Sequence, residues 1–269
     1  SLRGSEFRQQ ATGDNVGFDA NDWHVAAGGQ AALSGGWSLG GALAYGQRRV
    51  SVDASQASSR GDEFQAGLTA LRRDGVMQVA GGLAVGYGTY DNRRAPWGGG
   101  AVTATQRMWL VSGRVQAAWL FQRSAVALKP RIGVGVHYLS MDGFDETGDN
   151  AFRVSVDRQH DTYVDVLPAV DFYTQVETAD GLLVRPQLTL GLTQFVGNAA
   201  PSVTARFAAA PADVPAFTSR TKLDSTRLDA AASVTMYTSG NLSVRAEISG
   251  SFSRNTDAYG AGLKAALAF

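Results

Sequence analysis

Three histidines, His24, His137 and His160, are the side chains best suited to acid–base chemistry in this chain, and they stand far apart. No two of them have the helical spacing of a metal site such as H-E-x-x-H. His24 and His137 fall at alternating positions that we expect to face water, so we interpret them as solvated residues rather than catalytic bases. The sequence has no cysteine, which excludes thiol catalysis and cysteine-based metal sites. We expect neither a metal nor a cofactor.

An acid–imidazole pair occurs at His160 and Asp161, in a polar segment that we expect to be a loop at the outer rim. A loop dipeptide of this kind is solvated far more often than it is catalytic. We therefore expect no enzymatic activity.

Three carboxylates, Asp165, Asp171 and Glu177, recur at positions that share one face of an extended chain. They could form a proton-sharing pair, but ion pairing with basic side chains is the favoured alternative. The basic side chains expected to pair with them are Lys129, Arg185 and Arg227.

Composition restricts the class of protein. Among 269 residues, 24 Lys and Arg balance 24 Asp and Glu, so the net charge is zero and a nucleic-acid partner is not expected. No apolar run is long enough for a transmembrane helix, and "SLRGSEFRQQ" lacks the pattern of a signal peptide. A membrane barrel stays possible, because its alternating strands leave the mean hydropathy near that of a soluble chain.

Alternation of apolar and polar side chains predicts strands along the whole chain. In "LKPRIGVGVHY", for example, Ile132, Val134 and Val136 share one face while Lys129 and Arg131 share the other. Continuing this phase gives a face of mixed charges and very small residues. The charged residues predicted on it are Arg114, Lys129, Arg131, Asp165, Asp171, Arg185, Arg227, Asp229, Arg245, Glu247 and Lys264.

A closed sheet that is apolar outside and charged inside is favourable only with lipid outside and water inside. The alternative, a half-solvated sheet, needs a second layer, and no remaining segment could supply one. The sequence therefore predicts an all-β fold, a transmembrane antiparallel β-barrel with these charged residues lining its lumen.

Short and long links alternate between the predicted strands, as they do between the periplasmic turns and extracellular loops of such barrels. The short links lie at 34–36, 73–75, 122–124, 179–181 and 238–241. The longer links lie near 11–21, 51–60, 91–103, 140–160 and 197–219, with a brief one at 254–257. Counting segments gives about 12 strands, the first near 1–10, with both ends on the periplasmic side.

The last predicted strand ends on Phe269 and has Tyr259, Leu263 and Leu267 on the same face. It resembles the assembly signal of bacterial outer-membrane barrels. The whole chain, with "WSLGGALAYGQRRV", "LKPRIGVGVHYLSMDGFDETG" and "VRPQLTLGLTQFVGN", resembles the translocator (β) domain of monomeric autotransporters. Two features depart from that pattern: Leu267 is not aromatic, and "SLRGSEFRQQ" is too short for a pore helix and a strand.

The resemblance implies one translocator domain over 1–269, integral to the bacterial outer membrane, that supports export of an N-terminal passenger to the cell surface. It implies the lipid bilayer, the barrel-assembly machinery and the protein's own passenger as partners, a monomeric state, and self-cleavage of the passenger inside the barrel as an alternative to no enzymatic activity. We expect the chain to be a fragment without the pore helix. A stand-alone porin or small-solute channel is the alternative function.

Overall fold

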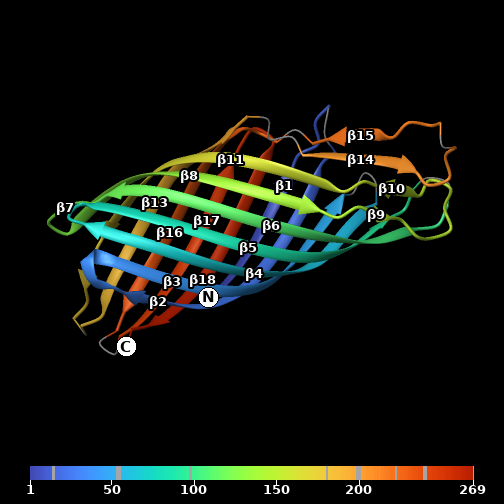
Figure 1. Ribbon diagram of the computed structural model, residues 1–269. Helices are drawn as coiled ribbons and strands as arrows, with labels where there is room; N and C mark the ends of the chain where they lie inside the picture. Colours follow the sequence, from blue (N-terminus) through green and yellow to red (C-terminus); the bar gives the residue numbers. More distant parts are fainter. Residues whose placement is uncertain are drawn as a thin grey trace.

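The protein forms a closed antiparallel barrel, described here in a computed structural model of residues 1–13, 16–52, 56–96, 99–179, 181–197, 201–211, 213–221, 223–238 and 241–268. The main sheet has fourteen strands; two of them are short, so twelve long strands make the wall (Figure 1). Pairing of β8 with β11 and of β1 with β18 closes the ring, which confirms the predicted fold. The wall strands are β1 (Leu2–Gln9), β2 (Phe18–Ala32), β3 (Trp37–Val52), β4 (Ala57–Asp74), β5 (Met77–Arg94), β6 (Val102–Trp119), β8 (Val126–Met141), β11 (Gln159–Thr174), β13 (Leu183–Val196), β16 (Thr226–Tyr237), β17 (Leu242–Phe252) and β18 (Thr256–Leu267).

One end of the barrel has short links. There the short strands β7 (Phe121–Arg123) and β12 (Val176–Glu177) extend the sheet, and a single 3-10 turn, η1 (Ser34–Gly36), joins β2 to β3. Among the described residues no helix is long and apolar enough to span a membrane.

The other end carries a second, four-stranded sheet beyond the barrel wall (Figure 1). Its strands are β9 (Phe144–Asp145), β10 (Val154–Val156), β14 (Ser202–Phe207) and β15 (Phe217–Arg220). The sequence predicted only polar loops at 140–160 and 197–219. That prediction was wrong in part, because the two loops meet in space and satisfy each other's backbone groups by pairing.

His160 and Asp161 were wrongly predicted to lie in a loop; both are inside β11. Successive side chains of a strand point to opposite faces, so the two residues cannot act together on one substrate. Asp161 accepts a hydrogen bond from Gln159 Nε2 at 2.7 Å, and the His160 ring lies beside Tyr138. The wall strands simply extend further outward than the hydrophobic pattern indicates.

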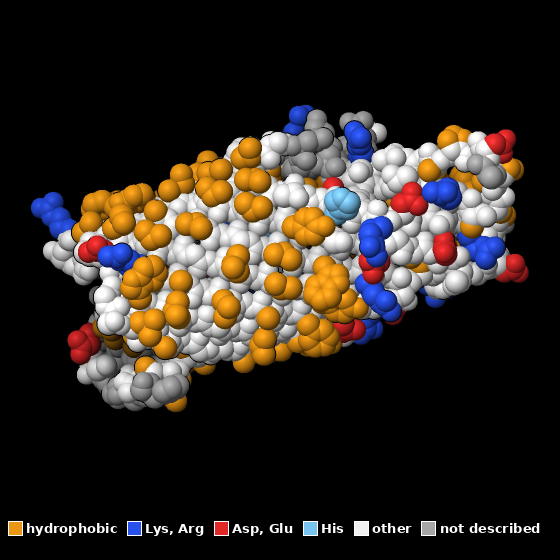
Figure 2. Space-filling model, in the orientation of Figure 1, with side chains coloured by type: hydrophobic (Ala, Val, Ile, Leu, Met, Phe, Trp, Pro, Cys, Tyr) orange, Lys and Arg blue, Asp and Glu red, His pale blue; other side chains and the backbone are white. Residues whose placement is uncertain are grey.

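The outer surface of the wall is apolar. Leu43, Leu68 and Leu83 point outward and are 69%, 68% and 67% exposed. Figure 2 shows hydrophobic side chains spread over the barrel wall, with charged side chains gathered toward its ends. So large an exposed apolar surface is stable only against lipid.

Few apolar side chains are fully enclosed. The described buried residues include more polar or charged side chains than apolar ones, among them Asp165, Asp171, Ser233 and Thr235. The protein is therefore inverted relative to a water-soluble one, with its polar groups on the inner wall.

Candidate functional site: the polar inner wall

The inner wall collects the polar positions of the strands. Strand registers place all eleven predicted lumen residues at positions that alternate with the exposed apolar face. In β8, for example, the outward Ile132, Val134 and Val136 are about half exposed, whereas Lys129 and Arg131 reach a carboxylate of the next strand.

Asp171 of β11 is the centre of one inner-wall cluster. Lys129 Nζ lies 3.2 Å from Asp171 Oδ2, and Arg131 Nε lies 3.5 Å from Asp171 Oδ1. Thr189 of β13 donates a hydrogen bond of 2.8 Å to the same carboxylate, whose side chain is only 4% exposed. A buried carboxylate is tolerated when it is paired and hydrogen-bonded in this way, so the cluster ties three strands together.

The other two basic residues expected to pair with carboxylates stack on aromatic rings instead. Arg185 lies between Tyr173 and Tyr237, with its guanidinium carbon 5.5 and 5.1 Å from the ring centroids. Arg227 lies 4.8 Å from the centroid of the Phe195 ring. These contacts were not predicted, because cation–π partners on neighbouring strands leave no charge pattern in the sequence.

Asp165 of β11 is the centre of a second cluster. His137 Nε2 lies 2.7 Å from Asp165 Oδ2, and His137 Nδ1 lies 2.9 Å from Ser112 Oγ. Arg114 Nη2 lies 3.7 Å from Asp165 Oδ1. Ser112 was not among the predicted residues, although it stands two positions before Arg114 and therefore shares its face.

A third polar cluster, on β1–β5, was also missed. Ser5 donates a hydrogen bond to Asp22, whose carboxylate lies 3.2 Å from His24 Nδ1. The Glu63 carboxylate accepts a hydrogen bond from Tyr90 and lies 3.4 Å from Arg48 Nη1. Extending the alternation into "YGQRRV" and "GDEFQ" would have identified both charged partners.

The remaining predicted residues lie on β16–β18. Asp229 accepts a hydrogen bond of 2.6 Å from Thr193 on β13. Arg245 and Glu247 form an ion pair at 2.6 Å on one strand, and Lys264 stands directly opposite Arg245. Acidic and basic side chains are thus interspersed on the inner wall, although Arg245 and Lys264 bring two like charges together.

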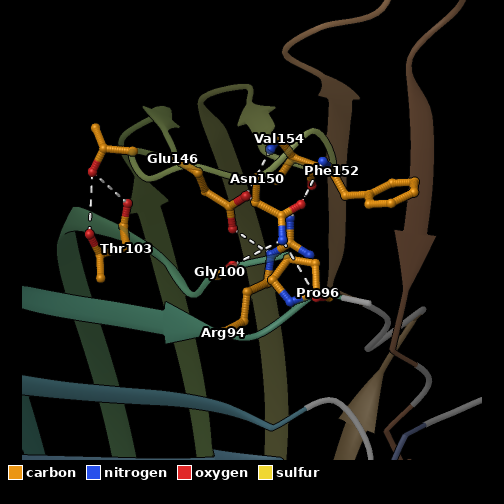
Figure 3. Close-up of polar contacts among 9 residues, drawn as sticks. Arg94, Pro96, Gly100, Thr103, Glu146, Asn150, Phe152 and Val154 are labelled. Carbon is orange, nitrogen blue, oxygen red and sulfur yellow. Dashed lines mark hydrogen bonds and ion pairs between the residues drawn. The ribbon is translucent and has the colours of Figure 1, made fainter. Parts of the chain in front are cut away.

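At the outer rim, a buried ion pair holds the loops together (Figure 3). Arg94, at the end of β5, reaches both Glu146 oxygens with its Nε and Nη2 at 2.5 and 2.6 Å, and Nη2 also donates to the Phe152 carbonyl. Glu146 accepts a further hydrogen bond from the Val154 amide at 2.8 Å. Asn150 donates to the Gly100 carbonyl at 2.9 Å. These contacts join the described parts of the β5–β6 loop to the outer sheet.

The predicted assembly residues lie on the last strand. Tyr259, Leu263 and Leu267 of β18 point outward and are 55%, 56% and 62% exposed. Phe269, the fourth, lies outside the described residues.

A closed antiparallel barrel with an apolar outer face and a charged inner wall defines an integral outer-membrane β-barrel. The chain belongs to the autotransporter β-domain family, whose model ("Autotransporter beta-domain") matches residues 1–249. It is accordingly an outer-membrane anchor and translocator for a covalently linked passenger that it helps to export.

Solved structures agree on the fold. The translocator domain of NalP from Neisseria meningitidis is 14% identical, with a TM-score of 0.78 over 100% of this chain and 88% of that one. The β-domain of the Bordetella autotransporter BrkA is 18% identical, with a TM-score of 0.67 over 97% and 96%. The transport unit of AIDA-I from Escherichia coli is 10% identical, with a TM-score of 0.60 over 100% and 89%. A comparison with curated protein sequences gives no match.

Proposed function

We propose that residues 1–269 act as one translocator unit whose eleven charged inner-wall residues line the conduit for the passenger. One observation supports this proposal most strongly: the inner wall carries charges of both signs that form ion pairs. Lys129 and Arg131, which both pair with Asp171, are an example. Charges neutralised by neighbours, as in the Asp165 and Asp171 clusters, do not trap a passing polypeptide. The inner-wall residues named above for the described part of the chain are charged or polar, and such a surface avoids the sticking that a large apolar patch would cause. Export of this kind requires no covalent chemistry from the barrel.

Single-cysteine variants test this lining directly, because the native chain has no cysteine to remove. Cysteines at Arg185 and Lys264 should react with a charged, water-soluble thiol reagent when the barrel is in lipid vesicles. Cysteines at the outward positions Val134 and Leu188 should react far more slowly, because lipid shields them. Equal reaction at both sets of positions contradicts the proposed lining.

We also propose that the barrel-assembly machinery recognises the outward residues of β18 together with Phe269. Deleting Phe269 should leave refolding in vitro largely intact but lower insertion in cells, since one terminal side chain adds little burial. Wild-type amounts of the deletion variant in the outer membrane contradict this role.

The monomeric state is a third proposal, supported by a ring of strands that closes within one chain. Light scattering in detergent should give the mass of one chain. A defined larger mass, independent of protein concentration, contradicts it.

A further inference from the structure

A serine, a histidine and a carboxylate form one hydrogen-bonded chain on the inner face of three neighbouring strands. Ser112 Oγ of β6 lies 2.9 Å from His137 Nδ1 of β8, and His137 Nε2 lies 2.7 Å from Asp165 Oδ2 of β11. Nucleophile, base and orienting carboxylate follow one another in this order in serine hydrolases at similar separations. There the serine bonds to Nε2 and the carboxylate to Nδ1, whereas here the two ring nitrogens exchange these roles. We infer that the three residues form an acyl-transfer site that hydrolyses small carboxylic esters entering the lumen, an activity separate from passenger export.

The hydrogen bonds fix the tautomer that catalysis needs. An ionised carboxylate can only accept, so a neutral His137 donates its Nε2–H to Asp165. His137 Nδ1 then carries a lone pair and accepts the hydrogen bond of the Ser112 hydroxyl. A general base that already accepts the proton of the nucleophile is ready to remove it.

The sheet register positions Asp165, which does not touch the substrate itself. Ser112 lies directly opposite His137, whereas Asp165 lies opposite Gly135. A β-carbon on Gly135 would come within 2.6 Å of Asp165 Oδ1, so the glycine leaves the space in which the carboxylate reaches His137. Asp165 is 4% exposed at its side chain, so water competes little for its bonds.

The surroundings of Ser112 suit a small, activated substrate. Its other cross-strand neighbour is Ala84 of β5, which has a short side chain. Arg114, next on the same face, is half exposed and points a guanidinium nitrogen toward Asp165 at 3.7 Å. Its other N–H groups can stabilise the oxyanion of an ester. One flexible donor is weaker than two fixed amides, which favours activated esters over amides.

The proposed reaction balances without any further reagent. The Ser112 oxygen bonds to the ester carbonyl carbon as its proton moves to His137 Nδ1, giving a tetrahedral oxyanion. Collapse breaks the bond to the leaving alcohol, which takes the proton from His137. Water, deprotonated by His137, then attacks the acyl-serine, releases the carboxylic acid and returns the proton to Ser112. The net change is ester plus water to acid plus alcohol.

The refolded chain of residues 1–269 in detergent is used to test the site with two probes, a fluorophosphonate and p-nitrophenyl acetate. The fluorophosphonate should label Ser112, as peptide mass spectrometry would locate it, and Ser112→Ala should abolish both the labelling and the ester hydrolysis. His137→Gln should slow labelling by at least about 100-fold, the usual minimum for a general base. Ser233→Ala, which removes a different serine, one that is buried on the inner wall, should change neither.

Asp165→Asn separates a positioning role from a merely structural one. It should slow labelling of the folded fraction, because Asp165 fixes the tautomer in which His137 Nδ1 accepts the serine proton. The groups facing His137 besides Ser112 are Arg114 on β6 and Asp161, Tyr163 and Asp165 on β11.

Heat-modifiable gel mobility identifies the folded fraction of each variant, and rates are compared for that fraction alone. The inference is overturned if wild-type protein is not labelled at Ser112, or if either His137→Gln or Asp165→Asn is labelled at the wild-type rate. Passenger export in cells is measured separately and does not enter this test.

Discussion

The membrane wall and the outer rim are both built from paired antiparallel strands, but their exposed side chains face different solvents. On the wall, Val134 is 46% exposed and faces lipid, while the charges of the same strands are turned inward. On the outer sheet, Val203 of β14 is 39% exposed and faces water, and the ion pair of Arg94 and Glu146 is enclosed by the rim loops. The exposed fraction of a side chain therefore does not by itself decide what that side chain contributes to stability. The solvent that it faces, lipid or water, decides this.

The largest effect is expected when the same substitution, valine to arginine, is made in each of the two regions. Val134→Arg should lower the free energy of unfolding by about 2 to 4 kcal/mol, because it places a charge near the bilayer midplane. Val203→Arg should change the free energy of unfolding by less than about 0.5 kcal/mol, since a surface charge stays hydrated. Refolding titrations into bilayers measure both.

An inner-wall control accompanies this pair. Arg131→Gln should cost less than about 1 kcal/mol, because Lys129 still neutralises Asp171 and water reaches the lumen. Equal losses of unfolding free energy in Val134→Arg and Arg131→Gln would contradict the assignment of Val134 to the outer face and of Arg131 to the inner wall.

The second expected effect concerns the rim itself. Glu146→Ala should lower the stability of the rim loops by about 1 to 3 kcal/mol, because it removes the carboxylate that accepts hydrogen bonds from Arg94 and from the Val154 amide. Limited proteolysis should then cut the rim loops faster while the barrel keeps its heat-modifiable mobility. Asp157→Ala, which breaks only the exposed pair with Arg206, is the matched control and should leave cleavage unchanged. Faster cleavage of both variants would mean that burial of the ion pair is unimportant.

The sequence was sufficient for the wall but not for the rim. Alternation in "LKPRIGVGVHY" predicted the strand, its apolar face and the inward Lys129 and Arg131, since lipid on one side and water on the other impose period two. The outer sheet could not be predicted, because β10 and β14 are short segments that pair only after distant loops meet. Ser112 escaped notice because a lone serine in a strand has no pattern of its own.

The smallest expected effect is a pH dependence at the rim. Burial opposes ionisation of Asp224, but hydrogen bonds from Ser253 and Asn255 outweigh it and hold the pKa of that carboxyl below its usual range. A lowered native pKa stabilises the fold above the unfolded pKa of about 3.9, and this stability is lost as the pH falls through the native pKa. Asp224→Asn should cost about 1 kcal/mol at neutral pH.

NMR of the barrel in micelles checks this last effect. The Asn255 amide signal should move as Asp224 takes up a proton below about pH 4, and it should not titrate in Asp224→Asn. If the Asn255 signal titrates in the same way in the wild type and in Asp224→Asn, the role assigned to Asp224 is contradicted.

Export of a reporter tests the central claim most directly. A signal peptide, an epitope-tagged reporter and a helical linker are fused ahead of Ser1, and intact cells are treated with external protease. If the charged inner wall lines a passenger conduit, the tag becomes accessible when the barrel is intact and stays protected when the barrel is not inserted. A barrel that inserts normally while the tag remains inside the cell would contradict the account.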